Sequence, residues 1–417
     1  MFKLSNTTSA KKIFLWNAIG SGCNAFSTMV ILMVINHFYG QIEGGIVSIA
    51  LALAQQMLTI SNFETATFYV TDSKKETGFD VHFSTKTILF VIAVIASIVT
   101  ALYKYDFYKA TVVICFCVYK ATDGFATLTT GALQREGRLD LAGMSLTFKT
   151  AVSIVALIAV SLISKNLMLA ASVMVVFGVL WTTVIDIGMV ASFLPIKFNC
   201  SIKSIVKLII DCAPLFLTTF LFTYIINQPK YVIDAVLSEE SQNVFGIIFM
   251  PSAVITMLSL FIYRPMLTTL TNYWAENNTK SFWGLVAKVA LILLVLTIVC
   301  VCGAALLGVP VLSLLFGVDL TGTATQLCLI IVGGGLYAFS TLLYNVLAIF
   351  RKQRLMLAAC FIVYVLAIIV TKPLIVALNL NGAALSYVFA NAVLGILLLI
   401  CCLFVSKNKE GNSCEKC

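Results

Sequence analysis

Two ionisable side chains, Lys120 and Asp123, lie in the middle of an apolar stretch long enough to cross a membrane. If this helix enters the hydrocarbon layer near Ala110, Lys120 lies about 15 Å deep at a rise of about 1.5 Å per residue, close to the midplane of a layer about 30 Å thick. A charge at that depth costs roughly 2.5–3.5 kcal/mol on insertion scales, so such residues face a water-filled cavity or a partner. Because they are three positions apart on one helix, the two can also neutralise each other. The pair therefore predicts a polar interior between helices, in which Lys120 contacts either a ligand or only Asp123.

Other ionisable residues lie in or near apolar stretches in both halves of the chain. Lys149 lies about 12 Å into a helix that starts near Leu141, and Lys288 about 9 Å into one that starts near Phe282. Lysine and arginine are the usual partners of phosphate groups, so cations from both halves could line a cleft for an anion such as a pyrophosphate. Carboxylates among them could hold the lysines in place or carry a coupling cation. The candidate substrate-binding residues are Lys120, Asp123, Lys149, Lys288, Arg264, Asp186 and Glu64.

Simpler roles compete for two of these residues. Lys288 can extend to the membrane interface, and Arg264 can anchor the inner end of its span. The thirteen cysteines lie mostly within apolar runs, where they act as small hydrophobic residues and argue against a disulfide framework. His37 and His82 are isolated, without metal-ligand spacing. The sequence therefore predicts no catalytic residue, no cofactor and no metal site.

The elements that must position these side chains are membrane-spanning helices, since 60% of the residues are hydrophobic and only 11% are charged. Most of the 27 lysine and arginine residues fall at helix ends on the side of the termini. The positive-inside rule therefore places both termini in the cytoplasm and explains the net charge of +9 without nucleic acid. Twelve apolar runs are expected to span: 13–35, 43–68, 86–103, 110–133, 141–163, 167–193, 205–226, 243–263, 282–308, 323–350, 355–378 and 382–405.

The twelve spans contain signs of a duplicated unit. The motif Arg-x-x-Arg-Leu-x-Leu begins at Arg135 after the fourth span and again at Arg351 after the tenth. This predicts an N-terminal six-helix lobe, 1–200, a C-terminal six-helix lobe, 201–406, and a cytoplasmic tail, 407–417. Two such halves, related by an axis along the membrane normal, place a substrate site between them and rock to expose it alternately.

Four segments resemble the Wzx-like polysaccharide repeat-unit flippases of the MOP exporter superfamily. These are Leu15-Trp16-Asn17-Ala18-Ile19-Gly20-Ser21 with Phe38-Tyr39-Gly40; Ile60-Ser61-Asn62-Phe63 running to Val70-Thr71-Asp72; Lys120-Ala121-Thr122-Asp123 through Gln134-Arg135-Glu136-Gly137-Arg138-Leu139-Asp140; and Asn227-Gln228-Pro229-Lys230-Tyr231-Val232-Ile233-Asp234 with Phe249-Met250-Pro251. The fourth segment, interpreted as an outer loop and the eighth helix, is the most specific.

The resemblance implies an all-α, MATE/MOP-like membrane protein with two parallel six-helix halves around a central cleft. It implies a bacterial inner-membrane transporter, not an enzyme, that moves an undecaprenyl-pyrophosphate-linked oligosaccharide from the cytoplasmic to the outer leaflet. The glycan would be destined for capsule, exopolysaccharide or O-antigen. The implied partners are this lipid-linked glycan, the bilayer and polysaccharide polymerase or assembly proteins.

Three other functions compete with this one. A multidrug/cation antiporter of the same superfamily would need a cleft dominated by acidic residues. A lipid II-type flippase is expected to have more spans and an arginine-rich cleft. A membrane-embedded glycan polymerase or ligase would need large outer loops that carry catalytic residues, and the longest expected outer loop, Asn227 to Asn243, is too short.

Overall fold

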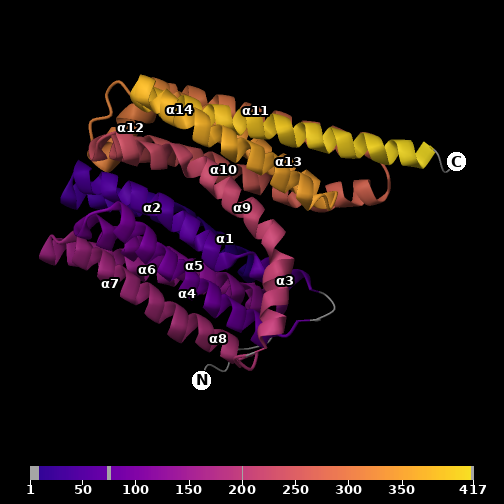
Figure 1. The fold of residues 1–417 in the computed structure, drawn as a ribbon, viewed down its shortest axis with the longest axis horizontal. Coiled ribbons are helices and arrows are strands. Elements are labelled where there is room, and N and C mark those ends of the chain that lie inside the picture. Colours follow the sequence, from indigo (N-terminus) through magenta and orange to yellow (C-terminus); the bar gives the residue numbers. More distant parts are fainter. Residues whose placement is uncertain (1–8, 73–76, 200, 415–417) are drawn as a thin grey trace. The chain divides into compact units, whose positions relative to one another are not determined.

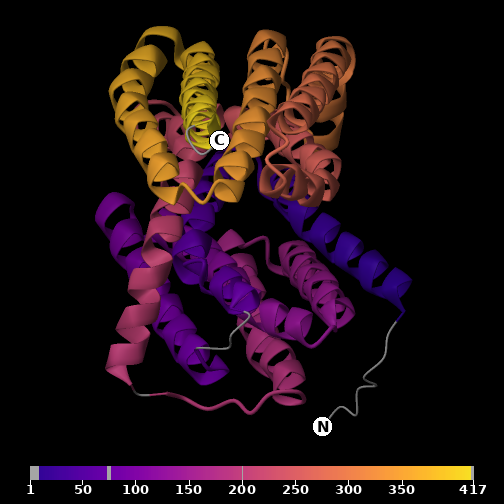
Figure 2. The same cartoon turned by 90° about the vertical axis from the view of Figure 1, so that its right-hand side faces the viewer.

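All regular elements of the described residues, 9–72, 77–199 and 201–414, are helices in the computed structural model (Figure 1). Eleven of them are long and apolar enough to cross a membrane. The last of these, α14 (Gln353–Cys414), is interrupted at Asn379, whose φ of 51° and ψ of −130° are not helical. Figure 2 shows the chain reversing direction within this yellow part of the ribbon. The two legs of α14 therefore supply two spans, and the prediction of an all-α protein with twelve transmembrane helices is confirmed.

The reversal within α14 depends on a glycine. An added Cβ at Gly382 would lie 2.0 Å from the carbonyl oxygen of Leu374, so the two legs approach more closely than a side chain allows. Asparagine at the turn itself tolerates positive φ better than most residues. Sequence reasoning found both spans because the apolar runs stop on either side of this turn.

The chain divides into two compact units, Met1–Thr223 and Tyr224–Cys417. In the first, α5 packs on α2 and α4, and α1 packs on α6. The boundary lies within α9, whereas the lobes expected from the sequence, 1–200 and 201–406, meet just before this helix; that assignment stays a prediction. The helices of the first unit are α1 (Ala10–Tyr39), α2 (Gln41–Asn62), α3 (Thr65–Thr71), α4 (Phe79–Lys104), α5 (Phe107–Arg135), α6 (Leu139–Ser164), α7 (Leu167–Leu180), the π-helix η1 (Trp181–Asp186), α8 (Ile187–Ala191) and the start of α9 (Ile202–Val236).

The second unit is built around α13, which packs on α10, α11 and α14. Its helices are the end of α9, α10 (Glu239–Ala275), α11 (Thr279–Gly303), the π-helix η2 (Ala304–Gly308), α12 (Val309–Phe316), α13 (Ala324–Ile349) and α14. The expected outer loop from Asn227 to Asn243 is wrong, because α9 continues to Val236 and α10 begins at Glu239. The polar side chains that suggested a loop, including Asn227 and Lys230, are buried and helical.

The two turns that carry the repeated arginine motif have the same backbone geometry. Gly137 and Arg351 both adopt positive φ, at 70° and 56°. In each turn, the next residue donates a backbone hydrogen bond across the helix end, Arg138 to Leu133 and Lys352 to Leu347. Structurally, Gly137 therefore corresponds to Arg351, two residues out of register with the motif. The motif predicted a repeated turn but paired the wrong residues.

Candidate functional site

The two lysines and the aspartate predicted at the core of the site meet inside the first unit. Lys120 and Asp123 lie one turn apart on α5, with the Lys120 Nζ 3.0 Å from Oδ2 of the aspartate. Lys149 comes from α6, and its Nζ lies 2.8 Å from the other carboxylate oxygen, Oδ1. All three side chains are buried, at 5%, 9% and 2% exposure. One carboxylate thus accepts charge-assisted hydrogen bonds from two ammonium groups.

Neutral side chains complete this cluster. Lys149 also donates to Thr122 Oγ1 at 2.8 Å, and Lys120 lies 3.4 Å from Asn24 Oδ1 on α1. Both ammonium groups lie within 6 Å of the Tyr119 ring centroid, at 5.7 and 5.9 Å, a range in which aromatic rings attract cations. The cluster therefore joins α1, α5 and α6 through polar contacts.

Glycines let the neighbouring helices approach α5 at this level. An added Cβ at Gly178 on α7 would lie 2.8 Å from the Tyr119 ring. At Gly124 it would lie 2.6 Å from the backbone of Leu58 on α2. Small residues at such contacts are typical of packed membrane helices. These close approaches hold the α5 charges in the interior of the unit.

Asp186 extends the cluster along the π-helix η1. Its carboxylate accepts a short hydrogen bond from Ser145 Oγ, which in turn accepts one from Trp181 Nε1 at 2.8 Å. Lys149 is close enough to interact electrostatically with this carboxylate. Single-turn π segments occur frequently at functional sites. With Asp186 included, the cluster holds two ammonium groups and two carboxylates and is formally neutral.

A third lysine, Lys86 on α4, forms a separate buried site that sequence reasoning missed. Its side chain is fully buried, and Nζ lies 2.8 Å from the backbone oxygen of Asn62, 2.9 Å from Thr127 Oγ1 and 3.4 Å from Thr65 Oγ1. The sequence placed Lys86 among the cations at cytoplasmic helix ends. The missed signal is its position seven residues into α4, about 10 Å along the helix.

Glu64 lies beside this second lysine site and not in the Lys120 cluster. It occupies the break between α2 and α3, where Phe63 and Glu64 both adopt left-handed backbone, with φ of 44° and 56°. Its carboxylate accepts hydrogen bonds from Thr67 Oγ1 at 2.7 Å and Asn62 Nδ2 at 3.3 Å. Non-glycine residues rarely adopt this conformation, which concentrates at functional sites.

The remaining two predicted residues belong to the second unit. Arg264 on α10 and Lys288 on α11 both have exposed side chains. That they line one cleft together with the lysines of the first unit stays a prediction.

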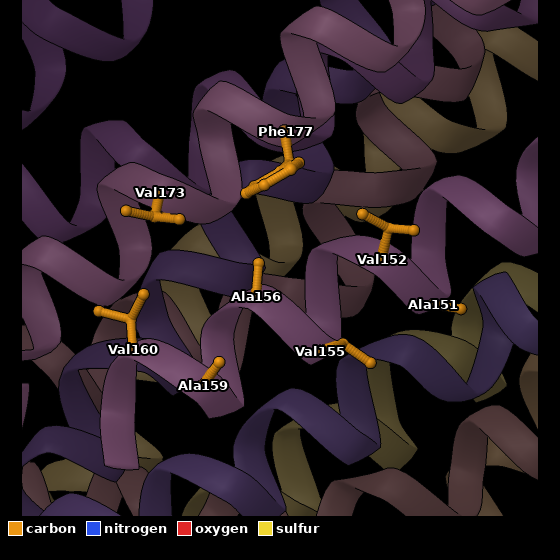
Figure 3. A pocket seen from close by; sticks show the side chains of 8 residues that line it. All are labelled: Ala151, Val152, Val155, Ala156, Ala159, Val160, Val173 and Phe177. Atoms are coloured by element: carbon orange, nitrogen blue, oxygen red, sulfur yellow. The ribbon is translucent and has the colours of Figure 1, made fainter. Parts of the chain in front are cut away.

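The opposite face of α6 is apolar. An open groove between α6 and α7 is lined by alanine, valine and phenylalanine side chains, among them Val152, Val155, Val160, Val173 and Phe177 (Figure 3). Ser153 and Lys149 lie on the buried face of the same helix. The residues that line this groove are therefore apolar, whereas Lys149 on the buried face of α6 contacts Asp123 of α5.

The fold is that of the MATE transporters of the MOP superfamily. An inward-facing multidrug resistance MATE transporter superposes with a TM-score of 0.70 at 15% identity, over 93% of this chain and 96% of its own. An outward-facing MATE transporter superposes with a TM-score of 0.58 at 17% identity, over 96% of each chain. A MOP superfamily transporter from Pyrococcus furiosus, described as having a binding pocket of reverse polarity, gives 0.57 at 14% identity, over 95% of each chain. No protein-family model and no curated protein sequence matches the chain.

Proposed function

We propose that this protein is an alternating-access transporter that flips an undecaprenyl-pyrophosphate-linked oligosaccharide to the outer leaflet, for capsule, exopolysaccharide or O-antigen synthesis. The observation that carries this proposal is that Asp123 forms salt bridges with both Lys120 and Lys149. With its carboxylate already shared between two ammonium groups, Asp123 has little attraction left for a cationic drug. A pyrophosphate can instead compete for the two lysines, because phosphate oxygens accept the same charge-assisted hydrogen bonds.

Elementary energetics supports such a role. A sugar headgroup crosses lipid poorly, because each polar group buried without a partner costs several kcal/mol. A polar path inside the protein removes that barrier while the prenyl tail stays in lipid. With the cell interior negative, outward movement of a doubly negative pyrophosphate gains up to roughly 2 × 2.3 kcal/mol per 100 mV. The membrane potential can therefore drive flipping without a coupled cation.

Multidrug export is the second candidate function, favoured by the fold that the chain shares with multidrug MATE transporters. A cationic drug would need a buried carboxylate without an ammonium partner at hydrogen-bond distance. Asp186 comes closest to this requirement, since its carboxylate accepts a hydrogen bond from the neutral hydroxyl of Ser145. The MOP fold also occurs in a transporter described as having reverse pocket polarity, so the fold by itself does not select the charge of the substrate.

The localisation that goes with this function is the bacterial inner membrane with both termini cytoplasmic, beside polymerase or assembly proteins. Cysteines placed at Lys165 and Lys352, in a cysteine-free version of the protein, test the orientation. Lys165 is exposed at the end of α6 and Lys352 in the turn before α14. We expect an impermeant maleimide added to intact cells to label the Lys165 position only. Labelling of both positions, or of Lys352 alone, would contradict the orientation.

Complementation of a flippase-null strain tests the function. We expect Lys120→Ala and Lys149→Ala to abolish surface glycan while the protein still reaches the membrane, because each change removes one phosphate partner. Lys165→Ala, which changes an exposed lysine, serves as the matched control and should restore glycan fully. Dye-efflux assays on the same strains test multidrug export. Wild-type glycan output from both variants would refute the role of the lysines, and dye efflux without glycan would favour the second candidate.

A further inference from the structure

The second unit buries a lysine that no acidic residue neutralises. Lys230 on α9 is 8% exposed, and its Nζ lies 4.2 Å from the centroid of the Phe249 ring. Among the residues that the structure describes, none forms a salt bridge or hydrogen bond with this ammonium group. By contrast, Lys86, Lys120 and Lys149 all have oxygen partners. The ammonium group of Lys230 is therefore buried without an oxygen partner among the described residues.

An unpaired buried ammonium is costly, and contact with an aromatic face offsets only part of the lost hydration. Lys230 also does not reach water at the helix end in the way that long basic side chains commonly do, because it remains 92% covered. Buried charges that persist under such conditions are typically paired with another charged group. A ligand that neutralises Lys230 would also contact other polar groups of the second unit.

One face of α10 supplies such groups. Gln242 is fully buried, and neither its Oε1 nor its Nε2 has a hydrogen-bond partner among the described residues. Phe249 follows seven residues later, which places it two turns along the same face, about 10 Å away. Ser252 continues the face and lies 3.0 Å from the Tyr387 hydroxyl of α14, whose ring is 4.9 Å from Phe249. The face thus presents an unpaired carboxamide, aromatic rings and hydroxyl groups.

Prolines lie within both helices next to these residues. Pro229 precedes Lys230 within α9, and Pro251 follows Phe249 by two residues within α10. Proline has no N–H, so each leaves the carbonyl of the residue four positions earlier without its helical partner. Carbonyl groups freed in this way inside a membrane need other polar partners, which a polar site can supply.

We propose that Lys230, Gln242 and Phe249 form a second binding site for an oxyanion that carries neighbouring hydroxyl groups, as a sugar phosphate or a uronic acid does. The ammonium of Lys230 neutralises the phosphate or carboxylate. Gln242 can both donate to and accept from a hydroxyl, which a sugar offers and a simple anion does not. The rings of Phe249 and Tyr387 pack against the apolar face of the sugar. This proposal rests on the proposed function and assigns part of the glycolipid headgroup to the second unit.

Ligand-dependent thermal stability of the purified full-length protein tests the site. Sodium pyrophosphate and sodium glucuronate are the probes, with glucose and NaCl of matched ionic strength as controls. We expect a saturable rise in melting temperature with at least one of the two anions and none with the controls. The part of each effect that depends on Lys230 assigns the site: a larger part with pyrophosphate assigns it to the phosphate linkage, and a larger part with glucuronate assigns it to an acidic sugar. A pyrophosphate effect that does not depend on Lys230 belongs to Lys120 and Lys149.

Variants at Lys230 decide whether this residue is responsible. In the background Lys120→Met/Lys149→Met/Asp123→Asn, which removes the anion partners of the first site, Lys230→Met should weaken the anion effect about 10- to 100-fold, the range for loss of a charge-assisted hydrogen bond. The ligand-free protein should melt at the same or a higher temperature than this background. Lys230→Arg should keep most of the effect, and Lys165→Met should leave it unchanged. The proposal fails if Lys230→Met does not change the anion response of this background, or if neither anion acts on the wild type. If this site fails the test but the protein still flips its glycolipid in cells, the proposed function stands without the site. If the purified protein binds the anion but does not flip the glycolipid, the site stands and the proposed function fails.

Discussion

Asp123→Asn isolates the charge balance of the Lys120 cluster with almost no change in side-chain volume. The aspartate neutralises two ammonium groups at 2.8 and 3.0 Å, and all three side chains are at most 9% exposed. Removal of one partner from a buried ion pair costs about 3–5 kcal/mol, because the other charge stays buried and unpaired. Here two like charges remain, with Asn24 and Thr122 as their nearest neutral acceptors. We therefore expect a cost at or above this range.

For a unit of about 220 residues, each kcal/mol lost from the free energy of unfolding lowers the melting temperature by roughly 2–4 °C. A loss of about 3–5 kcal/mol in Asp123→Asn should therefore lower it by about 6–20 °C. The assay is thermal denaturation of the purified protein in detergent, followed by size-exclusion chromatography at each temperature. Lys120→Ala should cost clearly less, because Asp123 then keeps the Lys149 ammonium at 2.8 Å. A melting temperature for Asp123→Asn within about 2 °C of the wild type would show that the carboxylate is not the shared partner of both lysines.

Two further changes probe the packing around the buried lysines. Gly178→Val should lower both melting temperature and glycan output, because a Cβ there would lie 2.8 Å from Tyr119; Gly188→Val, with no atom within 4 Å of its Cβ, is the matched control and should be neutral. Lys86→Met should destabilise the protein by about 1–3 kcal/mol, since the Oγ1 atoms of Thr65 and Thr127 then lose the ammonium group that donates to them. Chemical denaturation in detergent measures this cost, and an unchanged midpoint for Lys86→Met would contradict the hydrogen bonds of Nζ.

Apolar periodicity and length predicted the number of helices, because twelve separate runs of spanning length leave little choice of fold class. The same reasoning failed between Asn227 and Asn243, where polar residues suggested a loop. Helix α9 continues to Val236 and α10 begins at Glu239, because the second unit buries polar residues such as Asn227, Lys230 and Gln242. Burial by distant residues leaves no local signal in a sequence. The repeated arginine motif likewise predicted a repeated turn. The two turns correspond through the left-handed backbone at Gly137 and Arg351, and not through the alignment of Arg135 with Arg351.

The candidate site could be predicted where charges lie deep in a span. Lys120, Asp123 and Lys149 stand out because a charge near the membrane midplane needs a partner or a water-filled cavity, and Asp186 joins them through η1. Lys86 was missed because a lysine near a helix start usually reaches the interface. Which carboxylate pairs with which lysine depends on the packing of α5 on α6, which no spacing within one helix determines.

The question that the sequence left open, whether Lys120 contacts the substrate or only Asp123, can be decided because one carboxylate serves both lysines. Lys120→Met combined with Lys149→Met leaves Asp123 buried without an ammonium at hydrogen-bond distance, so the double variant should lose more stability than the sum of the single variants. Adding Asp123→Asn removes the stranded charge and should recover most of that stability, since buried ion pairs are often replaced by neutral residues at little cost. If the lysines serve only to neutralise Asp123, the triple variant should also regain glycan output in the flippase-null strain. If they bind the pyrophosphate, stability returns and glycan output does not. We expect stability to return without glycan output. Recovery of both stability and glycan output would show that the cluster has only a structural role.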